Sequence, residues 1–341
     1  MNNRILWLDY LRALACISVV LLHVSSVYVV DIKTISSLGL GDWLLSDYIN
    51  SITRFCVPVF FMLSGYFFFS EKKPKIKNFT RLLLSLAFYS IIAYSMYYLS
   101  SIIFPSVGIN DVKYTFFSEP AFYHLWFFYP LIVIYLISIF IKVRFESSNL
   151  GILIISFIFI VLSSGFSDIT RVILKFNINN FFSIDGDFVF YFLYAALGAC
   201  IKGCKIKKIK ISPYTLIFIF VLSSFSIAYL TYKNSIKNEN YISDFYSFTS
   251  PLVYLMSISL FILFAKLSDK LKPSTVISFL SKNSLAIYGI HAFFISILSK
   301  ITQYQNKNAF IYIPIIFITT MVGSVLFSII LKKIDKKGYI S

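Results

Sequence analysis

The chain of 341 residues contains little charge and few cysteines. Charged residues make up only 13% of it and hydrophobic residues 58%, whereas about 25% of a soluble domain is charged. This composition excludes a soluble globular protein and predicts a polytopic membrane protein. The 31 basic residues outnumber the 15 acidic ones, but nucleic-acid binding needs a soluble basic face, and the pattern contains none.

Other absences narrow the class further. The four cysteines, Cys16, Cys56, Cys200 and Cys204, fall in apolar segments or at their inner ends, so no extracytoplasmic disulfide is expected. Cys200 and Cys204 are one helical turn apart, but no histidine lies near them, so we expect no metal site. The sequence contains no glycine-rich phosphate loop and no internal repeat. We therefore expect a single transmembrane domain over 1–341.

Ten apolar segments approach the ~20 residues that a membrane-spanning helix needs. They are 6–30, 48–70, 82–104, 123–141, 150–167, 186–201, 212–232, 249–265, 284–299 and 309–331. The first resembles a signal peptide, but Asp9 and Arg12 interrupt it and no A-x-A cleavage site follows, so we expect a retained helix. The fold class predicted is an all-α bundle of about ten transmembrane helices.

Lysine and arginine are concentrated in alternate loops, and this asymmetry predicts the orientation. One side carries 21 of them, at Arg4, 71–81, Lys142 with Arg144, 202–210, 266–282 and 332–337. The other side carries 8, at Lys33, Lys113, Arg171 with Lys175, Lys233 with Lys237, and Lys300 with Lys307. Because loops rich in basic residues stay in the cytoplasm, both termini are predicted to be cytoplasmic.

The first apolar segment carries three ionisable residues: Asp9, Arg12 and His23. Ionisable residues at membrane depth are costly and mark functional sites. Arg12 and His23 are eleven residues apart, about three helical turns, so they share one face of the helix. Asp9 lies one turn before Arg12 and could orient it by an ion pair. At 1.5 Å per residue, His23 lies ~16 Å beyond Arg12 along the helix.

The second apolar segment contains another arginine, Arg54, seven residues after Asp47 and on the same helical face. One interpretation is an Asp47–Arg54 pair that only anchors packing. The other is an anion site, because Arg12 and Arg54 together suit a phosphate or pyrophosphate.

Small and helix-bending residues follow in the same segment, at Pro58, Ser64 and Gly65. They indicate a kink and a close backbone approach. Close packing alone would explain them equally well.

The chain has only three histidines, His23, His124 and His291, each inside or at the mouth of an expected span. A histidine in a membrane can bond a neighbouring helix or line a water pocket. That all three are purely structural is the less favoured reading, because histidine is the side chain best suited to proton transfer near neutral pH.

Four sequence blocks combine these ionisable residues with apolar runs: LDYLRALACISVVLLHV (8–24), RFCVPVFFMLSGYFF (54–68), HLWFFYPLIVIYL (124–136) and SFLSKNSLAIYGIH (278–291). Together they resemble the membrane-bound acyltransferase-3 family of bacterial O-acyltransferases. The first contains the family's signature, an arginine and a histidine separated by ten residues. The four blocks occur in the family's order and include all three histidines and both intramembrane arginines.

The resemblance implies transfer of an acyl group, usually acetyl from acetyl-CoA, to a sugar hydroxyl of an extracytoplasmic or lipid-linked glycan. The chain resembles the stand-alone members, which lack a periplasmic domain and modify O-antigens of lipopolysaccharide, common antigen or exopolysaccharides. It also implies a multi-pass protein of the bacterial inner membrane, with the lipid bilayer, acyl-CoA and a glycan as partners and no metal.

We assign expected roles on these grounds. The catalytic residues expected are His23 as general base, Arg12, Asp9, and His291 as the second candidate for the base. The residues expected to bind the acyl donor are Arg12, Arg54, Ser64 and Tyr288. Those expected to bind the acceptor are His124, Trp126 and Asp47, with His124 and Trp126 at the outer mouth.

Two alternatives remain open. Intramembrane charges mark transport routes as readily as active sites, so the same polar path could belong to a glycan exporter or flippase without chemistry. A sensor or scaffold in a polysaccharide assembly complex is the other alternative, and it would tolerate the loss of His23.

Overall fold

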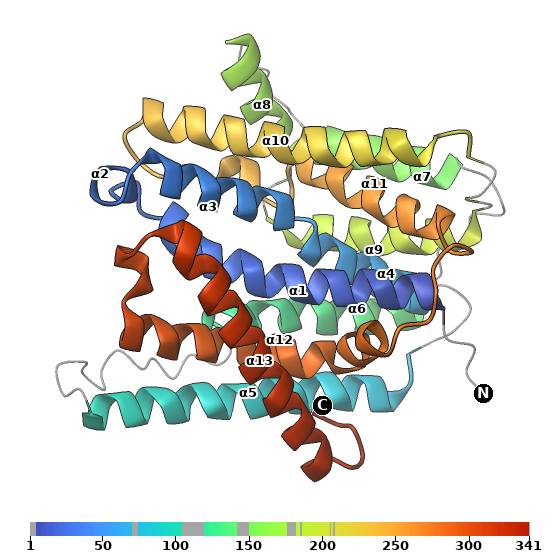
Figure 1. Ribbon diagram of the computed structural model, residues 1–341. Helices are drawn as coiled ribbons and strands as arrows, with labels where there is room; N and C mark the ends of the chain where they lie inside the picture. Colours follow the sequence, from blue (N-terminus) through green and yellow to red (C-terminus); the bar gives the residue numbers. More distant parts are fainter. Residues whose placement is uncertain are drawn as a thin grey trace.

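The computed structural model describes residues 5–69, 74–103, 119–141, 150–175, 182–184, 186–204, 206 and 209–340. Within that part every regular element is a helix, which confirms the predicted all-α class. The elements are α1 (Leu6–Val29), α2 (Thr34–Ser37), α3 (Leu40–Thr53), α4 (Cys56–Phe68), α5 (Ile76–Ile103), η2 (Tyr123–Phe127), α6 (Phe128–Phe140), α7 (Leu150–Leu162), α8 (Gly165–Leu174), α9 (Phe188–Gly203), α10 (Pro213–Lys237), η4 (Asp244–Tyr246), α11 (Pro251–Lys266), α12 (Thr275–Thr302), η5 (Tyr304–Asn306) and α13 (Ala309–Ile334). Figure 1 shows most of the long helices running side by side, with α13 at an angle to them.

Eight helical segments in the described part are long and apolar enough to cross a membrane. The helices α7 and α8, bent by 67° with respect to each other, would add a ninth if the pair makes up one span. The sixth expected segment, 186–201, corresponds to the shorter apolar helix α9. Each of the ten expected segments therefore contains a helix, and the chain is a polytopic membrane bundle.

The predicted start of the second span at residue 48 is wrong, because the apolar helical segment begins at Leu40. Asp42 and Asp47 lower the local hydropathy, yet both are buried. The backbone N–H of Ala309 donates to the carboxylate of Asp42, and the hydroxyl of Tyr246 donates to that of Asp47. Buried carboxylates with such partners are tolerated at membrane depth.

This second span is broken between α3 and α4, at Arg54 and Phe55. Pro58 explains the break, because it has no N–H to donate to the carbonyl of Arg54, four residues earlier. The expected kink is therefore present. It places Arg54 midway between Leu40 and Phe68, near the middle of the span.

The tightest packing in the core lies between α4 and α9. A Cβ atom on Gly65 would collide with the backbone carbonyl of Ala195, and one on Gly198 would collide with that of Met62. The two helices can therefore approach only because each presents a glycine to the other. This confirms the expected close backbone approach at Gly65.

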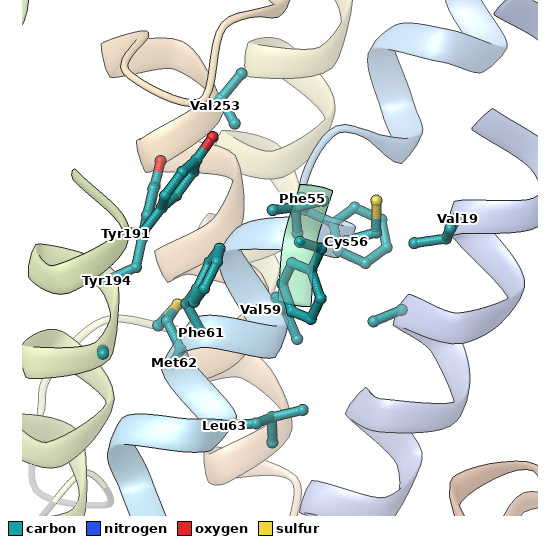
Figure 2. Close-up of a cluster of buried hydrophobic side chains, with 14 of the residues drawn as sticks. Val19, Phe55, Cys56, Val59, Phe61, Met62, Leu63, Tyr191, Tyr194 and Val253 are labelled. Carbon is teal, nitrogen blue, oxygen red and sulfur yellow. The ribbon is translucent and has the colours of Figure 1, made fainter. Parts of the chain in front are cut away.

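Large apolar side chains fill the space around this contact. Figure 2 shows Phe61 and Met62 of α4 on the side of Tyr191 in α9, and Cys56 on the side of Val19 in α1. The rings of Phe61 and Tyr191 are stacked, with centroids 4.6 Å apart. The helix α4 is thus held on both faces, which fixes the position of its first residues, just after Arg54.

We call the end of the bundle at which α1 begins the inner end, and the opposite end the outer end. The inner end is the side predicted to be cytoplasmic. Several residues that enter that prediction lie outside the described residues, namely Arg4, 71–73, Lys113, Lys142, Arg144, Lys205, Lys207 and Lys208, as does most of the loop 106–121. The orientation therefore stays a prediction.

Candidate active site

The three histidines meet at one place in the bundle, although they come from three different elements. His23 belongs to α1, His124 to η2 and His291 to α12. The ring centroid of His291 lies 5.3 Å from that of His23 and 5.2 Å from that of His124. The rings of His124 and His291 are completely buried. Three imidazoles in contact bring groups that can accept and donate protons near neutral pH to one place.

The hydrogen bonds of the two buried histidines determine which nitrogen carries the proton. The Nδ1 atom of His291 lies 2.6 Å from the carbonyl oxygen of Tyr288, and the Nε2 atom of His124 lies 3.0 Å from that of Gly289. A carbonyl oxygen only accepts, so these nitrogens are protonated and act as donors. In the neutral rings, Nε2 of His291 and Nδ1 of His124 are then acceptors. Both are buried without a hydrogen-bond partner among the described residues.

His23 differs from the other two because its side chain is partly exposed. Its ring also contacts Tyr123, with centroids 5.1 Å apart, and Tyr123 is itself 48% exposed. Of the three histidines, His23 is therefore the only one with a partly exposed side chain.

The position expected for His124, at the outer mouth of its span, is wrong. The residue is fully buried against Gly289, in the middle of α12. The hydroxyl of Tyr288 donates to the carbonyl oxygen of His124, which holds η2 at this depth. Gly289 is required here because a Cβ atom would overlap the ring of Tyr89. Hydropathy predicts the residue at which a span begins, but not how deeply the first turn of that span is buried in the bundle.

Tyr288, which the sequence predicts at the donor site, lies against two of the histidines. Its ring is 5.6 Å from that of His124 and 5.6 Å from that of His291, centroid to centroid. Tyr288 therefore packs against the histidine cluster, by which we mean His23, His124 and His291. Trp126 is partly buried in an aromatic group, with Tyr191 at 5.5 Å and Phe248 at 6.0 Å.

Arg54 lies in a polar group together with Asp47, Asn50 and Tyr246. It donates to the side-chain oxygen of Asn50, and its Cζ atom lies 4.2 Å from the ring centroid of Tyr246. The Tyr246 hydroxyl donates to the carboxylate of Asp47. The direct Asp47–Arg54 pair considered from the sequence is not formed between these two described residues, because Tyr246 links them.

This group is joined to His23. The side-chain nitrogen of Asn50 donates to the carbonyl of Leu22 at 3.2 Å and to the hydroxyl of Ser25 at 3.4 Å, on either side of His23 in α1. The guanidinium of Arg54 is close enough to His23 to interact with it electrostatically. Arg54 is thus linked through Asn50 to the turn of α1 that carries His23.

Asp9, Arg12 and Ser64 form a second group toward the inner end. Arg12 is 30% exposed, and its NH1 atom lies 4.0 Å from the carboxylate of Asp9. The Ser281 hydroxyl donates to that carboxylate at 2.6 Å, which fixes Asp9 for the expected one-turn pair. The Arg12 guanidinium lies 5.6 Å from the ring centroid of Phe67. Ser64, one turn earlier on α4, donates to the carbonyl of Phe60 at 2.9 Å.

The two arginines expected to bind one donor phosphate group therefore do not converge. Arg12 lies against Phe67 at the end of α4, and Arg54 precedes the start of that helix. Thirteen residues separate Arg54 from Phe67, which is ~20 Å along a helix. The sequence placed both arginines in spans but contained no information on which end of α4 each one faces.

Two members of the site were not predicted from the sequence. Asn50 is four residues before Arg54, and this spacing on one helix could have revealed it. Tyr246 lies in η4, almost two hundred residues after Arg54, and no local pattern connects the two. Within the described residues, no group of three or more His, Cys, Asp or Glu side chains is arranged to hold a metal ion.

Comparison with protein-family models matches residues 5–329 to the acyltransferase-3 family, described as an acyltransferase domain. The chain belongs to this family, and it is an acyltransferase of the membrane-bound, multi-pass type. Comparisons with curated proteins and with solved structures gave no significant match.

Proposed function

We propose that this protein transfers an acyl group, most simply acetyl, from cytoplasmic acyl-CoA to a sugar hydroxyl of a cell-surface or lipid-linked glycan. The proposal places it in the bacterial inner membrane and among the enzymes that modify O-antigen, common antigen or exopolysaccharide. The observation that carries it is the meeting of three histidines, one of them partly exposed, in an acyltransferase-family bundle.

His23 acts as the general base in this proposal. A sugar hydroxyl is a weak nucleophile at neutral pH, so removal of its proton in the transition state accelerates its attack on a thioester. The accessible ring of His23 can receive this proton. The buried acceptor atom Nε2 of His291 lies in the neighbouring ring, where it can orient an N–H of His23. A second group that orients the base is a recurrent feature of such sites.

The acyl donor enters from the inner end. Coenzyme A carries phosphates, and the partly exposed guanidinium of Arg12 offers a planar pair of donors suited to them. Asp9, held by Ser281, orients Arg12. The pantetheine arm would then extend along α1 over the ~16 Å that separates Arg12 from His23. Ser64 lies on the same side of the bundle as Arg12 and can contact the donor.

The acceptor glycan enters from the outer end. Tyr123 is half-exposed beside His23 and offers an aromatic face for a sugar ring. Trp126 lies three residues further along the chain, in its aromatic group. Asp47, which accepts from the hydroxyl of Tyr246, is an acidic group in this outer half. Acceptor contacts on this side would leave the inner end free for the donor.

The experiment uses the purified full-length chain in lipid nanodiscs, with acetyl-CoA and surface glycan from a strain that lacks the protein. Release of coenzyme A together with a mass increase of one acetyl group per glycan repeat is the expected result. If glycan export depended on the protein while neither coenzyme A release nor a mass change occurred, an exporter without chemistry would replace this proposal.

A further inference from the structure

Arg54 has a donor atom for which the described residues supply no acceptor. Its Nε–H is buried and forms no hydrogen bond in that part of the chain. The other end of the guanidinium is engaged, because one terminal nitrogen donates to Asn50 and the plane rests against the ring of Tyr246. A buried donor of a charged group without an acceptor is costly. Such a group is expected to meet an acceptor that arrives with the substrate.

The surroundings of Arg54 hold it in one orientation. Asn50, which accepts from Arg54, is fixed to α1 by its own bonds to Leu22 and Ser25. Tyr246 is 2% exposed, and its hydroxyl is fixed by Asp47. The position of the guanidinium is therefore set before any ligand binds, as electrostatic catalysis requires.

The location of Arg54 argues against a role in holding the phosphates of the donor. It lies near the middle of its span, ~20 Å along α4 from the residue that Arg12 contacts. The part of an acyl-CoA that reaches this depth, beside His23, is the thioester at the end of the pantetheine arm. The acceptor missing at Nε then corresponds to the thioester oxygen.

We propose that Arg54 is the oxyanion-stabilising residue of the acyl transfer, and that Tyr246 is the residue that positions it. The inference rests on the proposed function. The sugar oxygen attacks the carbonyl carbon while His23 takes the hydroxyl proton, and the carbonyl π electrons move onto the oxygen. Arg54 donates its Nε–H to this oxyanion. When the C=O bond re-forms, the C–S bond breaks and the coenzyme A thiolate takes the proton from His23.

This role makes a specific kinetic prediction for Arg54→Gln. One oxyanion donor contributes about 10²–10³ to kcat, so kcat should fall by that factor. The Kd for acyl-CoA should change less than about threefold, because the interaction is made chiefly in the transition state. Arg54→Lys should be almost as slow, since lysine keeps the charge but lacks the guanidinium fork. Arg12→Gln provides the contrast, with a raised Kd for acyl-CoA.

A second assay separates this role from acceptor binding. Without glycan, water can attack the bound thioester slowly and form the same oxyanion. Hydrolysis of acetyl-CoA by the nanodisc-embedded protein should therefore fall in Arg54→Gln by a factor similar to that for glycan transfer. A role in acceptor binding would leave this hydrolysis unchanged.

Tyr246 is tested by Tyr246→Phe and Tyr246→Leu. Both should lower kcat without changing the Kd for acyl-CoA, and the leucine variant should be slower because it also loses the ring under the guanidinium. Tyr254→Phe is the matched control. It removes a part-buried hydroxyl–hydroxyl bond to Ser156, between α11 and α7, and should leave kcat unchanged. Tyr246→Phe keeps the ring and its packing, so this test remains valid even if Arg54→Gln fails to fold.

The two proposals fail in different ways. If the wild-type chain neither transfers nor hydrolyses the acyl group, the proposed function is wrong and the role of Arg54 falls with it. If the wild type is active and Arg54→Gln regains the normal rate at saturating acyl-CoA, Arg54 is a donor-binding residue and this inference alone is overturned. Unchanged hydrolysis in Arg54→Gln would overturn it equally.

Discussion

The rings of His23 and His291 lie 5.3 Å apart, centroid to centroid, although α1 and α12 are at opposite ends of the chain. The first ring is partly exposed and the second is fully buried with its Nδ1 engaged by Tyr288. His23 is therefore the member of the pair that can contact a substrate, whereas His291 can contact only neighbouring side chains. This asymmetry divides the roles of the two residues.

The first prediction is that His23→Gln transfers acyl groups at least about a hundredfold more slowly, because glutamine cannot take the proton and general-base assistance contributes about 10²–10⁴. Acyl-CoA binding should persist. His291→Gln should retain more activity, since it loses only the orienting partner of the base. Initial rates of coenzyme A release measure both. Near-normal transfer by His23→Gln with an inactive His291→Gln would make His291 the base.

The second prediction concerns Arg12. Arg12→Ala should weaken acyl-CoA binding and leave glycan binding unchanged, and Arg12→Lys should be poorly tolerated, because lysine lacks the planar fork that a phosphate accepts. Titration of the purified variant with a non-hydrolysable acyl-CoA analogue measures the change.

The chain contains a matched control for Arg12. Arg171 in α8 also pairs with an aspartate three residues earlier, Asp168, at 2.9 Å, and it is half-exposed. Arg171→Ala should leave acyl-CoA affinity unchanged. Equal affinities in Arg12→Ala and the wild type would remove Arg12 from the donor site.

The helices of this fold could be predicted from sequence because hydrophobic length is a local property. The predicted span boundaries are wrong where a charged side chain is hydrogen-bonded by a residue distant in the sequence. Asp42 and Asp47 shortened the predicted second span, since hydropathy counts their charge and cannot count the partners Ala309 and Tyr246. The broken α3–α4 junction was foreseen because its cause, Pro58, lies within the segment.

Most members of the candidate site could be predicted from the sequence, but Asn50, Tyr246 and the grouping of the residues could not. Periodicity placed Arg12 and His23 on one face of α1, and the structure keeps them there. Periodicity could not show that Arg54 lies near His23. The hydrogen bonds that connect them run from Arg54 to Asn50 and from Asn50 to the backbone of α1. Tyr246 could not be predicted either, because its contacts with Arg54 and Asp47 also join distant segments. Contacts between distant segments decide which charges act together, and a single sequence does not record them.

A third prediction tests the packing of α4 on α9. Gly65→Ala would press a methyl group against the carbonyl of Ala195, so the helices must separate. Overpacking of this kind costs about 1–3 kcal/mol. The thermal midpoint of the detergent-solubilised protein should fall. Gly41→Ala is the control, since its Cβ would meet only the ring of Phe310, at 3.7 Å. An unchanged midpoint in Gly65→Ala would show that α4 and α9 are not in close contact.

The fourth prediction concerns orientation, on which the assignment of donor and acceptor sides depends. Lys75 and Lys237 are both exposed, at the inner and the outer end of the bundle. The excess of basic residues in the inner loops predicts that Lys75 faces the cytoplasm. In a cysteine-free background, a membrane-impermeant maleimide should label Lys237→Cys in intact spheroplasts and Lys75→Cys only after lysis. Labelling of Lys75→Cys before lysis, with Lys237→Cys protected, would invert the bundle. Arg12 would then face away from the cytoplasmic pool of acyl-CoA and could not be its entry point.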